Sequence, residues 1–397
     1  MDMTVKSMIR CIAPVTCHGM RWVTVFVSTL GVLVVVVFFT WEYFLYYHSY
    51  MLDTYASKFY PCFYDSSNVS IGPYHNNTWE ALIDSYERFR DPARHVIFVP
   101  YYWQGLCNRI LNSVSVVLFA IATNRTLWIE WESMNHTRIS SNEFGGIEGM
   151  RELFNVSFLM ERPPTLEADY WPPPYCVTRI VQFGNLHALD DQKVIHMNRH
   201  DFWGTHVMKN ARYKDTVFRD LDVYRGFPVL FRRLFALKKH VRPKRCSWFF
   251  QYRTVWPAPF HTAPFDEFIR CANQSGFSPS DYATSHVISD NPSAILETSS
   301  GYTRRILHQM NLPKSRLTCR GKCGDAKAME TMYELSECRR AVVSLGSSFG
   351  SCIAGLADVQ DWYRVGHDGT CRRVKHGLVD ANCNARDGCL NTYLANL

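Results

Sequence analysis

The sequence has little excess charge of either sign, which limits the partners that it can be expected to bind. Its net charge is +7, with 43 basic and 36 acidic residues among 397, and the excess is spread along the chain rather than gathered into one lysine and arginine run. Nucleic acid is therefore not the default partner. A local basic pocket for an anionic ligand would fit the same balance. The length allows one large or two medium cores, and two domains is the natural expectation.

The sequence also lacks the second close pair of cysteine or histidine residues that would complete a zinc finger. Cys319 and Cys323 have ligand-like spacing, as do Cys383 and Cys389, but no four-ligand set of finger type follows. Twelve of the 14 cysteines come after residue 41, as disulfides in an oxidising compartment would. Disulfides are favoured over zinc, and their connectivity stays open.

Charge is absent from residues 22–41, which end in a run of valine and phenylalanine. Twenty such residues can span a bilayer core of about 30 Å. Basic residues precede the run and acidic ones follow it, which predicts a cytosolic tail (1–21), a membrane anchor (22–41) and a lumenal remainder. A cleaved signal peptide is the alternative, but no small-x-small cleavage site ends the run. We expect a Golgi membrane protein of type II, with N-glycosylation at Asn68, Asn76, Asn135, Asn155 and Asn273; the sequon at Asn124 falls in a predicted tight turn.

Residues 42–90 have no sustained periodicity and are interpreted as a stem, with folded structure starting near His95. The first expected domain is 91–245. Residues 96–99 predict a buried strand, the apolar spacing from 110 to 121 a helix, and 127–131 a second strand. The loop between the first strand and the helix holds Gly105, Asn108 and Arg109, where strand-helix-strand units place ligand contacts. A plain connection is the alternative.

Residues 132–245 are the hardest to interpret. A helix is expected over 231–237. Asp220 and Asp222 resemble a metal-binding Asp-x-Asp pair, but they lie among arginines without a preceding apolar strand, so a solvated charged face is favoured and no metal is expected.

From residue 246 to 397, short apolar runs alternate with helical ones, and we expect the second domain here. The expected strands are 248–252, 294–296, 316–318 and 341–345; the expected helices are 265–272, 302–310, 326–336 and one from Cys352. Alternation at these lengths predicts a parallel sheet covered on both faces.

Two turns in this second domain have the side chains that a nucleotide-sugar donor site needs. The diphosphate is the leaving group, so growing negative charge must be stabilised, and arginine, backbone amides and a helix N-terminus are suited to this. Arg253 follows a predicted strand. Ser347 and Ser348 can donate to phosphate oxygens, while Gly346 and Gly350 permit close backbone approach; a simple helix cap is the alternative. The general base stays open among Glu130, Asp201, His196, His261 and Asp266.

Six blocks, in order, resemble the plant-type xyloglucan and galactoside α-1,2-fucosyltransferase family. They include 85–88, 105–111 with 123–127, 198–203, 250–253 with Pro259 and Cys271, 296–302, and 327–356, of which the last is the most similar. The resemblance departs from the family pattern at Cys107, which replaces a glycine, at Phe250, and in the cysteines of the chain's end.

The resemblance implies an α/β fold of GT-B type, with two Rossmann-like domains facing a cleft. It implies an inverting enzyme without metal or other cofactor, which moves fucose from GDP-fucose to O2 of galactose on an oligosaccharide or polysaccharide acceptor. Arg253 is implied as the catalytic contact to the diphosphate, and the implied donor-binding residues are Gly105, Asn108, Arg109, Gln251, Arg253, Ser347, Ser348, Phe349 and Gly350. Alternatives are transfer to a core N-glycan sugar or a protein hydroxyl, and a catalytically silent glycan-binding membrane protein; a homodimer is possible.

Overall fold

The computed structural model describes residues 78–100, 105–130, 146–155, 192–197, 202–222, 225–254, 263–312, 322–359 and 362–374. These residues fall in one compact unit, residues 63–397. The expected tail and membrane anchor lie outside the described residues, as do the sequons at Asn68, Asn76 and Asn135. Asn155 and Asn273 are both exposed, so both stay predicted glycosylation sites.

The described chain begins with a helix rather than a stem. Helix α2 (Trp79–Phe89) buries Trp79, Leu82, Ile83 and Tyr86, which recur at the spacing of one helix face. The side chain of Thr78 caps it by accepting a hydrogen bond from the amide of Ala81 at 3.2 Å. Folded structure therefore starts before His95, contrary to expectation. The helix was not predicted because charged residues lie between the apolar residues of its short buried face.

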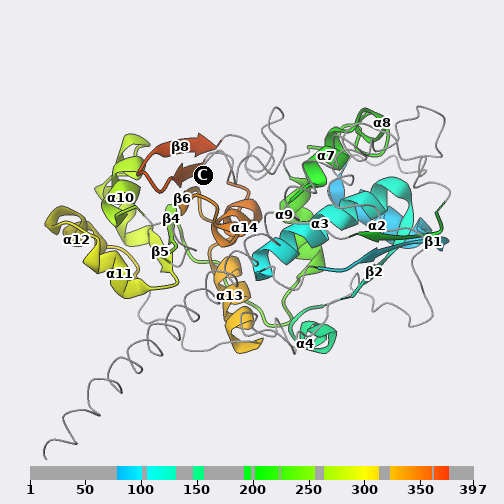
Figure 1. Ribbon diagram of the computed structural model, residues 1–397, viewed down its shortest axis with the longest axis horizontal. Helices are drawn as coiled ribbons and strands as arrows, with labels where there is room; N and C mark the ends of the chain where they lie inside the picture. The colour runs from blue at the N-terminus through cyan, green and yellow to red at the C-terminus, as the bar shows by residue number, and fades with distance from the viewer. Residues whose placement is uncertain are drawn as a thin grey trace, which may run out of the picture. The chain divides into compact units, whose positions relative to one another are not determined.

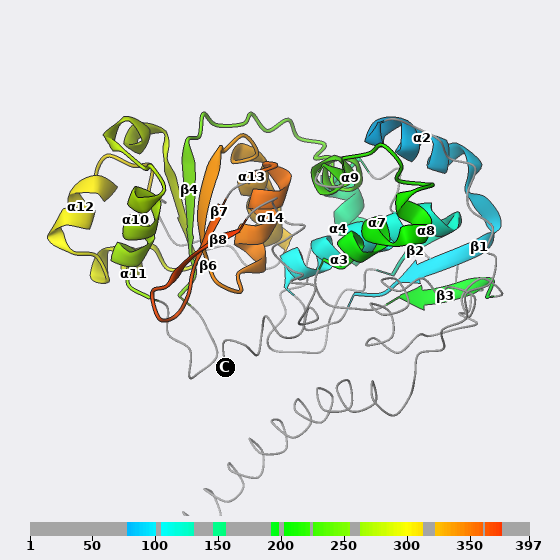
Figure 2. The ribbon, with the colours of Figure 1, turned by 90° about the horizontal axis from the view of Figure 1, so that it is seen from above.

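Among the described residues, the amino-terminal half contains a three-stranded parallel sheet of order β2-β1-β3, labelled in Figure 2; β1 and β2 are also labelled in Figure 1. Strand β1 (Asp91–Phe98) pairs with β2 (Arg125–Ile129) and with β3 (Val194–Met197). Helix α3 (Leu106–Thr123) connects β1 to β2. Asn124 ends α3 in the left-handed conformation, with φ 51°, which confirms the predicted tight turn. The predicted strand-helix-strand unit is thus present.

Helix α3 forms the core of this half. In the described part of the chain it alone has the length and hydropathy of a membrane span, and 89% of it is buried within the protein, as in the core helix of a soluble domain. Helix α9 (Gly226–Leu234) packs beside it. The other helices in the described residues of this half are α4 (Gly146–Leu153), α7 (Gly204–Lys209) and α8 (Ala211–Lys214).

The carboxyl-terminal half contains a five-stranded sheet of order β5-β4-β6-β7-β8. Its strands are β4 (Trp248–Tyr252), β5 (His286–Ser289), β6 (Arg340–Ser344), β7 (Trp362–Val365) and β8 (Cys371–Val374). The first four are parallel and β8 is antiparallel to β7. The helices described in this half are α10 (Phe265–Gln274), η2 (Pro279–Thr284), α11 (Pro292–Glu297), α12 (Gly301–Leu307), α13 (Lys322–Glu334) and α14 (Ser348–Leu356).

Helices cover both faces of this sheet, as predicted. Figure 2 shows α10, α11 and α12 on one face and α13 and α14 on the other. Side chains alternate along β4: Trp248, Phe250 and Tyr252 join the cluster that includes Phe265 and Phe268 of α10. Residues between them point to the opposite face, so Gln251 points toward α14.

One expectation for this half is wrong, and two of its features were not predicted. Residues 294–296 lie in helix α11, because Pro292 occupies its first turn, where proline favours a helix start. The strand that pairs with β4 is instead β5, which was not predicted. The hairpin of β7 and β8 was also missed, since arginines break its apolar pattern. The expected strand 316–318 lies outside the described residues.

Within the described residues, two disulfides, both in the carboxyl-terminal half, confirm that cysteines pair with one another. Cys246 is bonded to Cys338, and Cys271 to Cys371. Cys107 and Cys352 are buried.

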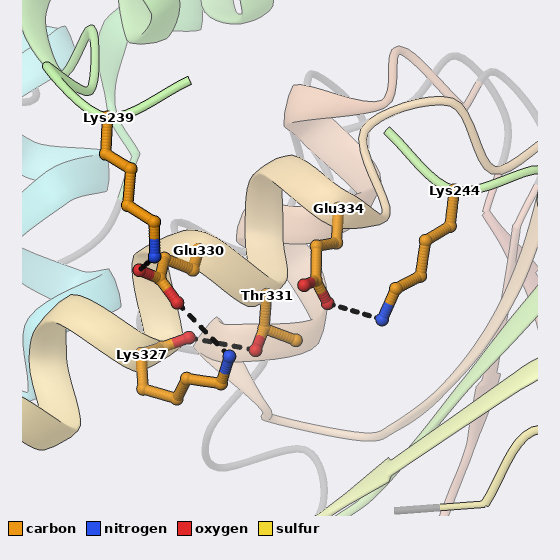
Figure 3. A network of polar contacts seen from close by, with 6 residues as sticks. All are labelled: Lys239, Lys244, Lys327, Glu330, Thr331 and Glu334. Atoms are coloured by element: carbon orange, nitrogen blue, oxygen red, sulfur yellow. Dashed lines mark hydrogen bonds and ion pairs between the residues drawn. The ribbon is translucent and has the colours of Figure 1, made fainter. Parts of the chain in front are cut away.

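The connection between the two halves lies along α13 and forms ion pairs with it (Figure 3). Lys239 Nζ lies 2.7 Å from Glu330 Oε1, and Lys244 Nζ lies 2.6 Å from Glu334 Oε2. The two glutamates are one helical turn apart, so they present both carboxylates to the same stretch of linker. Lys244 N also donates to the carbonyl of Glu334 at 2.7 Å. The predicted domain boundary at residues 245 and 246 falls at the end of this linker.

Candidate functional site

The candidate site forms where β4 and β6 end side by side. Parallel strands place their carboxyl ends at one edge of a sheet, which is where open α/β sheets bind ligands. Arg253 follows β4 directly and is half-buried. Its backbone amide donates to Ser344 Oγ at 2.9 Å, and Ser344 is the last residue of β6. The structure thus brings Arg253 next to the turn that leads from β6 into α14.

That turn requires a glycine and presents a helix N-terminus. Gly346 has φ 75°, a conformation that other residues adopt only with strain. Ser347 caps α14, because its hydroxyl oxygen accepts a hydrogen bond from the backbone amide of Gly350 at 3.4 Å. Ser347 is 2% exposed, whereas Ser348 and Phe349 are half-buried. The helix-cap alternative therefore describes Ser347, and Ser348 is the more accessible hydroxyl for an anionic ligand.

Gly350 lets α14 lie directly against the sheet. A Cβ atom built on Gly350 would be 2.8 Å from Val343 Cγ1 and 3.1 Å from Gln251 Oε1. Gln251 is 4% exposed, and its Oε1 has no hydrogen-bond partner in the described part of the chain. A buried acceptor without a partner is costly. Gln251 therefore places an unsatisfied carbonyl oxygen beneath the first turn of α14.

The predicted loop of the first domain approaches the same helix. Cys352 Sγ lies 3.5 Å from the carbonyl oxygen of Cys107, so the first turn of α3 contacts α14. Arg109 is 2% exposed and Asn108 is half-buried. Gly105 is exposed, and a Cβ there would meet nothing within 4 Å. The structure thus brings Asn108 and Arg109 near α14, while Gly105 has no steric need to be glycine.

On its other side, the end of β4 is held by the residue that follows β5. Asp290 Oδ1 accepts hydrogen bonds from Thr254 N at 2.8 Å and from Thr254 Oγ1 at 2.9 Å. Strands β4 and β5 pair up to Tyr252 and Ser289, so this contact extends the pairing past the last strand residues. Neither Ser344 nor Asp290 was predicted as a site residue.

The predicted general bases differ in what they contact. Asp266 accepts three hydrogen bonds from Ser300. Burial raises the pKa of Asp266, but hydrogen bonds from Thr303 and Ser300 outweigh it and leave the pKa below its ordinary value. This favours a helix-capping role for Asp266. Glu130 follows β2 and is half-buried, and His196 is buried in β3; Asp201 and His261 lie outside the described residues.

Metal ligands do not cluster in the parts of the chain that the structure describes. Asp220 and Asp222 are exposed, and Asp220 has φ 64° in a turn. Their placement fits the solvated face that the sequence favoured over an Asp-x-Asp metal site. The expectation of an enzyme without a metal or other cofactor stays a prediction.

Comparison with known proteins gives a likeness of structure but none of sequence. No protein-family model and no curated protein matches the sequence. A mutant of FUT1 from Arabidopsis thaliana in complex with GDP is similar, with 15% identity, a TM-score of 0.50, and coverage of 77% of this chain and 80% of that one. The two proteins therefore share an α/β fold. The fucosyltransferase NodZ from Bradyrhizobium matches 71% of this chain and 99% of its own at 14% identity, with a TM-score of 0.42.

The likeness confirms the coarse prediction of an α/β fold with parallel sheets. It leaves the roles of the predicted donor-binding residues as predictions. The residues that sequence reasoning missed, Ser344 and Asp290, each stand at or directly after a strand end. That position was the available signal for Ser344, whereas Asp290 was hidden because β5 itself was not predicted.

Proposed function

We propose that the protein is an inverting, metal-independent fucosyltransferase that moves L-fucose from GDP-fucose to a hydroxyl group of a glycan. The observation that carries this proposal is the arrangement of Arg253 beside the first turn of α14. Arg253 carries a positive charge and the first turn of α14 has backbone amides as hydrogen-bond donors, and the two lie where β4 and β6 end. The fold likeness supports it, since the FUT1 structure is described as a complex with GDP.

In this reaction the bond between fucose C1 and the diphosphate oxygen breaks, and GDP leaves with the electron pair. The acceptor oxygen attacks C1 from the opposite side and loses its proton to a base. Arg253 and the amides of the first turn of α14 stabilise the charge that grows on the diphosphate. Such contacts can act without a metal ion, which is why we propose metal independence.

The acceptor is proposed from the family resemblance, which favours O2 of galactose. A core N-glycan sugar or a protein hydroxyl is the alternative within the same fold. We further propose that residues 22–41 anchor the protein in the Golgi membrane as a type II protein, with the described domain in the lumen. The uncharged segment and the two disulfides support this placement.

The full-length protein should bind GDP in the presence of EDTA and should transfer fucose, but not sugars from UDP donors, to members of a glycan array. Arg253→Ala should lower kcat/KM by about 100-fold or more, since a lost contact to developing charge costs about 3–4 kcal/mol. Arg305→Ala is the matched control, because Arg305 is an exposed arginine of α12. Absence of GDP binding in the wild-type protein would refute the proposal, and GDP binding without transfer would favour a silent glycan-binding protein.

A further inference from the structure

Arg253 and Thr254 are each held by a side chain that lies at or directly after the end of a neighbouring strand. The regular pairing of β4 with β6 ends at Gln251 and Val343. Beyond that pair, the hydroxyl of Ser344 takes the place of the next backbone hydrogen bonds between the two strands. Ser344 Oγ accepts from Arg253 N at 2.9 Å and donates to the carbonyl of Gln251 at 3.2 Å. Ser344 is 3% exposed, so water does not compete for these bonds.

The opposite neighbour holds the next residue. The carboxylate of Asp290 accepts hydrogen bonds from the backbone amide and the hydroxyl of Thr254, at 2.8 and 2.9 Å. Residues 255–262 lie outside the described structure, so Thr254 is the last described residue on this side. Hydrogen bonds to a charged acceptor are stronger than those between neutral groups. Consecutive residues of the chain are therefore held from two different strands.

We propose that Ser344 and Asp290 are positioning residues, which hold the backbone of Arg253 so that its guanidinium group meets the donor diphosphate. This inference rests on the proposed function. A long side chain reaches a fixed point reliably only when its Cα is fixed, because misplacement by about 1 Å can cost 100-fold in rate. The end of a strand, where ladder bonds stop, is where such support is needed.

Each residue has a matched control elsewhere in the fold. Ser285 is fully buried, and its hydroxyl donates to the carbonyl of Asp281 at 2.8 Å, but it precedes β5 at the opposite edge of the sheet. Asp368 accepts from Thr370 N at 3.0 Å and from Thr370 Oγ1 at 2.7 Å, the same pattern as Asp290, in the turn between β7 and β8. Ser285→Ala removes one buried hydroxyl bond and Asp368→Ala removes two carboxylate bonds, and neither residue contacts Arg253.

The test is a double-mutant cycle with Arg253→Ala, measured on the full-length protein as kcat/KM for GDP-fucose. We expect Ser344→Ala and Asp290→Ala each to lower kcat/KM roughly 10- to 100-fold. In the Arg253→Ala background the same changes should have less than about a twofold effect, because they act through that arginine. Ser344→Thr, which keeps the hydroxyl, should recover activity. The controls should reduce thermal stability at most, with kcat/KM unchanged.

Hydrogen exchange of the peptide covering residues 248–254 gives a readout that needs no activity. Ser344→Ala and Asp290→Ala should each speed exchange in this peptide, and the controls should not. Additive effects in the cycle, or unchanged exchange with an active wild-type enzyme, would overturn the positioning role alone. A wild-type protein that neither binds GDP nor transfers fucose would overturn the proposed function, and this role with it. Asp290 is exposed, so Asp290→Ala should fold even if Ser344→Ala does not.

Discussion

Replacing Gly350 with alanine tests whether the contact between α14 and the sheet sets the geometry of the site. The added Cβ would lie 2.8 Å from Val343 Cγ1 and 2.9 Å from Val343 Cβ. Carbon atoms pack best at about 3.5–4.0 Å, so the start of α14 must move away from β6 by roughly 0.6–1 Å. Val343 is fully buried in a β strand and is stiff about χ1, so it cannot give way easily.

The expected magnitude follows from two opposing terms. Overpacking of this kind costs about 1–3 kcal/mol, while replacing a helical glycine with alanine gains up to about 1 kcal/mol. We therefore expect Gly350→Ala to lower the free energy of unfolding by about 1–2 kcal/mol. A shift of the first turn by nearly 1 Å should also lower kcat/KM by about 100-fold if that turn binds the diphosphate.

Gly301→Ala is the matched control for this change. Gly301 lies in the first turn of α12, and a Cβ there would meet nothing within 4 Å. It should be neutral or stabilise the protein by up to about 1 kcal/mol. Urea unfolding and GDP-fucose kinetics of both variants decide the matter. Equal stability and equal kcat/KM for the two variants would refute the view that α14 is set by its contact with Val343.

Three further predictions concern stability. Replacing Cys246 and Cys338 by serine should lower the free energy of unfolding by up to about 4–5 kcal/mol, since the bond closes a loop of 92 residues; an unchanged urea midpoint would contradict this. Burial lowers the pKa of His286 below 6.5, so the unfolded chain binds the proton more tightly than the folded protein does. The free energy of unfolding should therefore fall as pH drops from about 7.5 to 5.5. Urea titrations of His286→Asn should show a weaker dependence on pH. Lys239→Ala should barely change the melting temperature, because the Lys239 side chain is 74% exposed in its ion pair; a clear drop would mean that the linker pairs stabilise the fold.

The sequence predicted those elements of the fold whose apolar pattern is strong. Strand β4 was predicted to the residue, because Trp248 to Tyr252 is a compact apolar run. Strand β5 was missed, because its short sequence includes His286 and Ser289 and only two apolar residues, while the apolar residues after Pro292 gave a stronger but misleading signal. Period alone cannot separate a short buried helix from a strand.

The candidate site could be located from sequence but not built from it. The position of Arg253 after a strand and of Gly346 before a helix was enough to bring both to one sheet edge. The hydrogen bonds around Arg253 depend instead on the register of three strands, since Ser344 reaches its amide only because β4 and β6 pair as they do. Register is a long-range property that neighbouring residues do not encode.

Gln251 is the polar residue of strand β4. It is a polar residue in a strand whose other members are aromatic, and alternation turns it toward α14 rather than into the aromatic cluster. Its side-chain oxygen Oε1 is buried without a partner in the described structure, which an apolar residue of the same size would avoid. Stability alone therefore does not explain a glutamine here. A polar group held beneath the first turn of a helix, one strand step from Ser344, fits a site arranged for a bound polar ligand at the expense of packing.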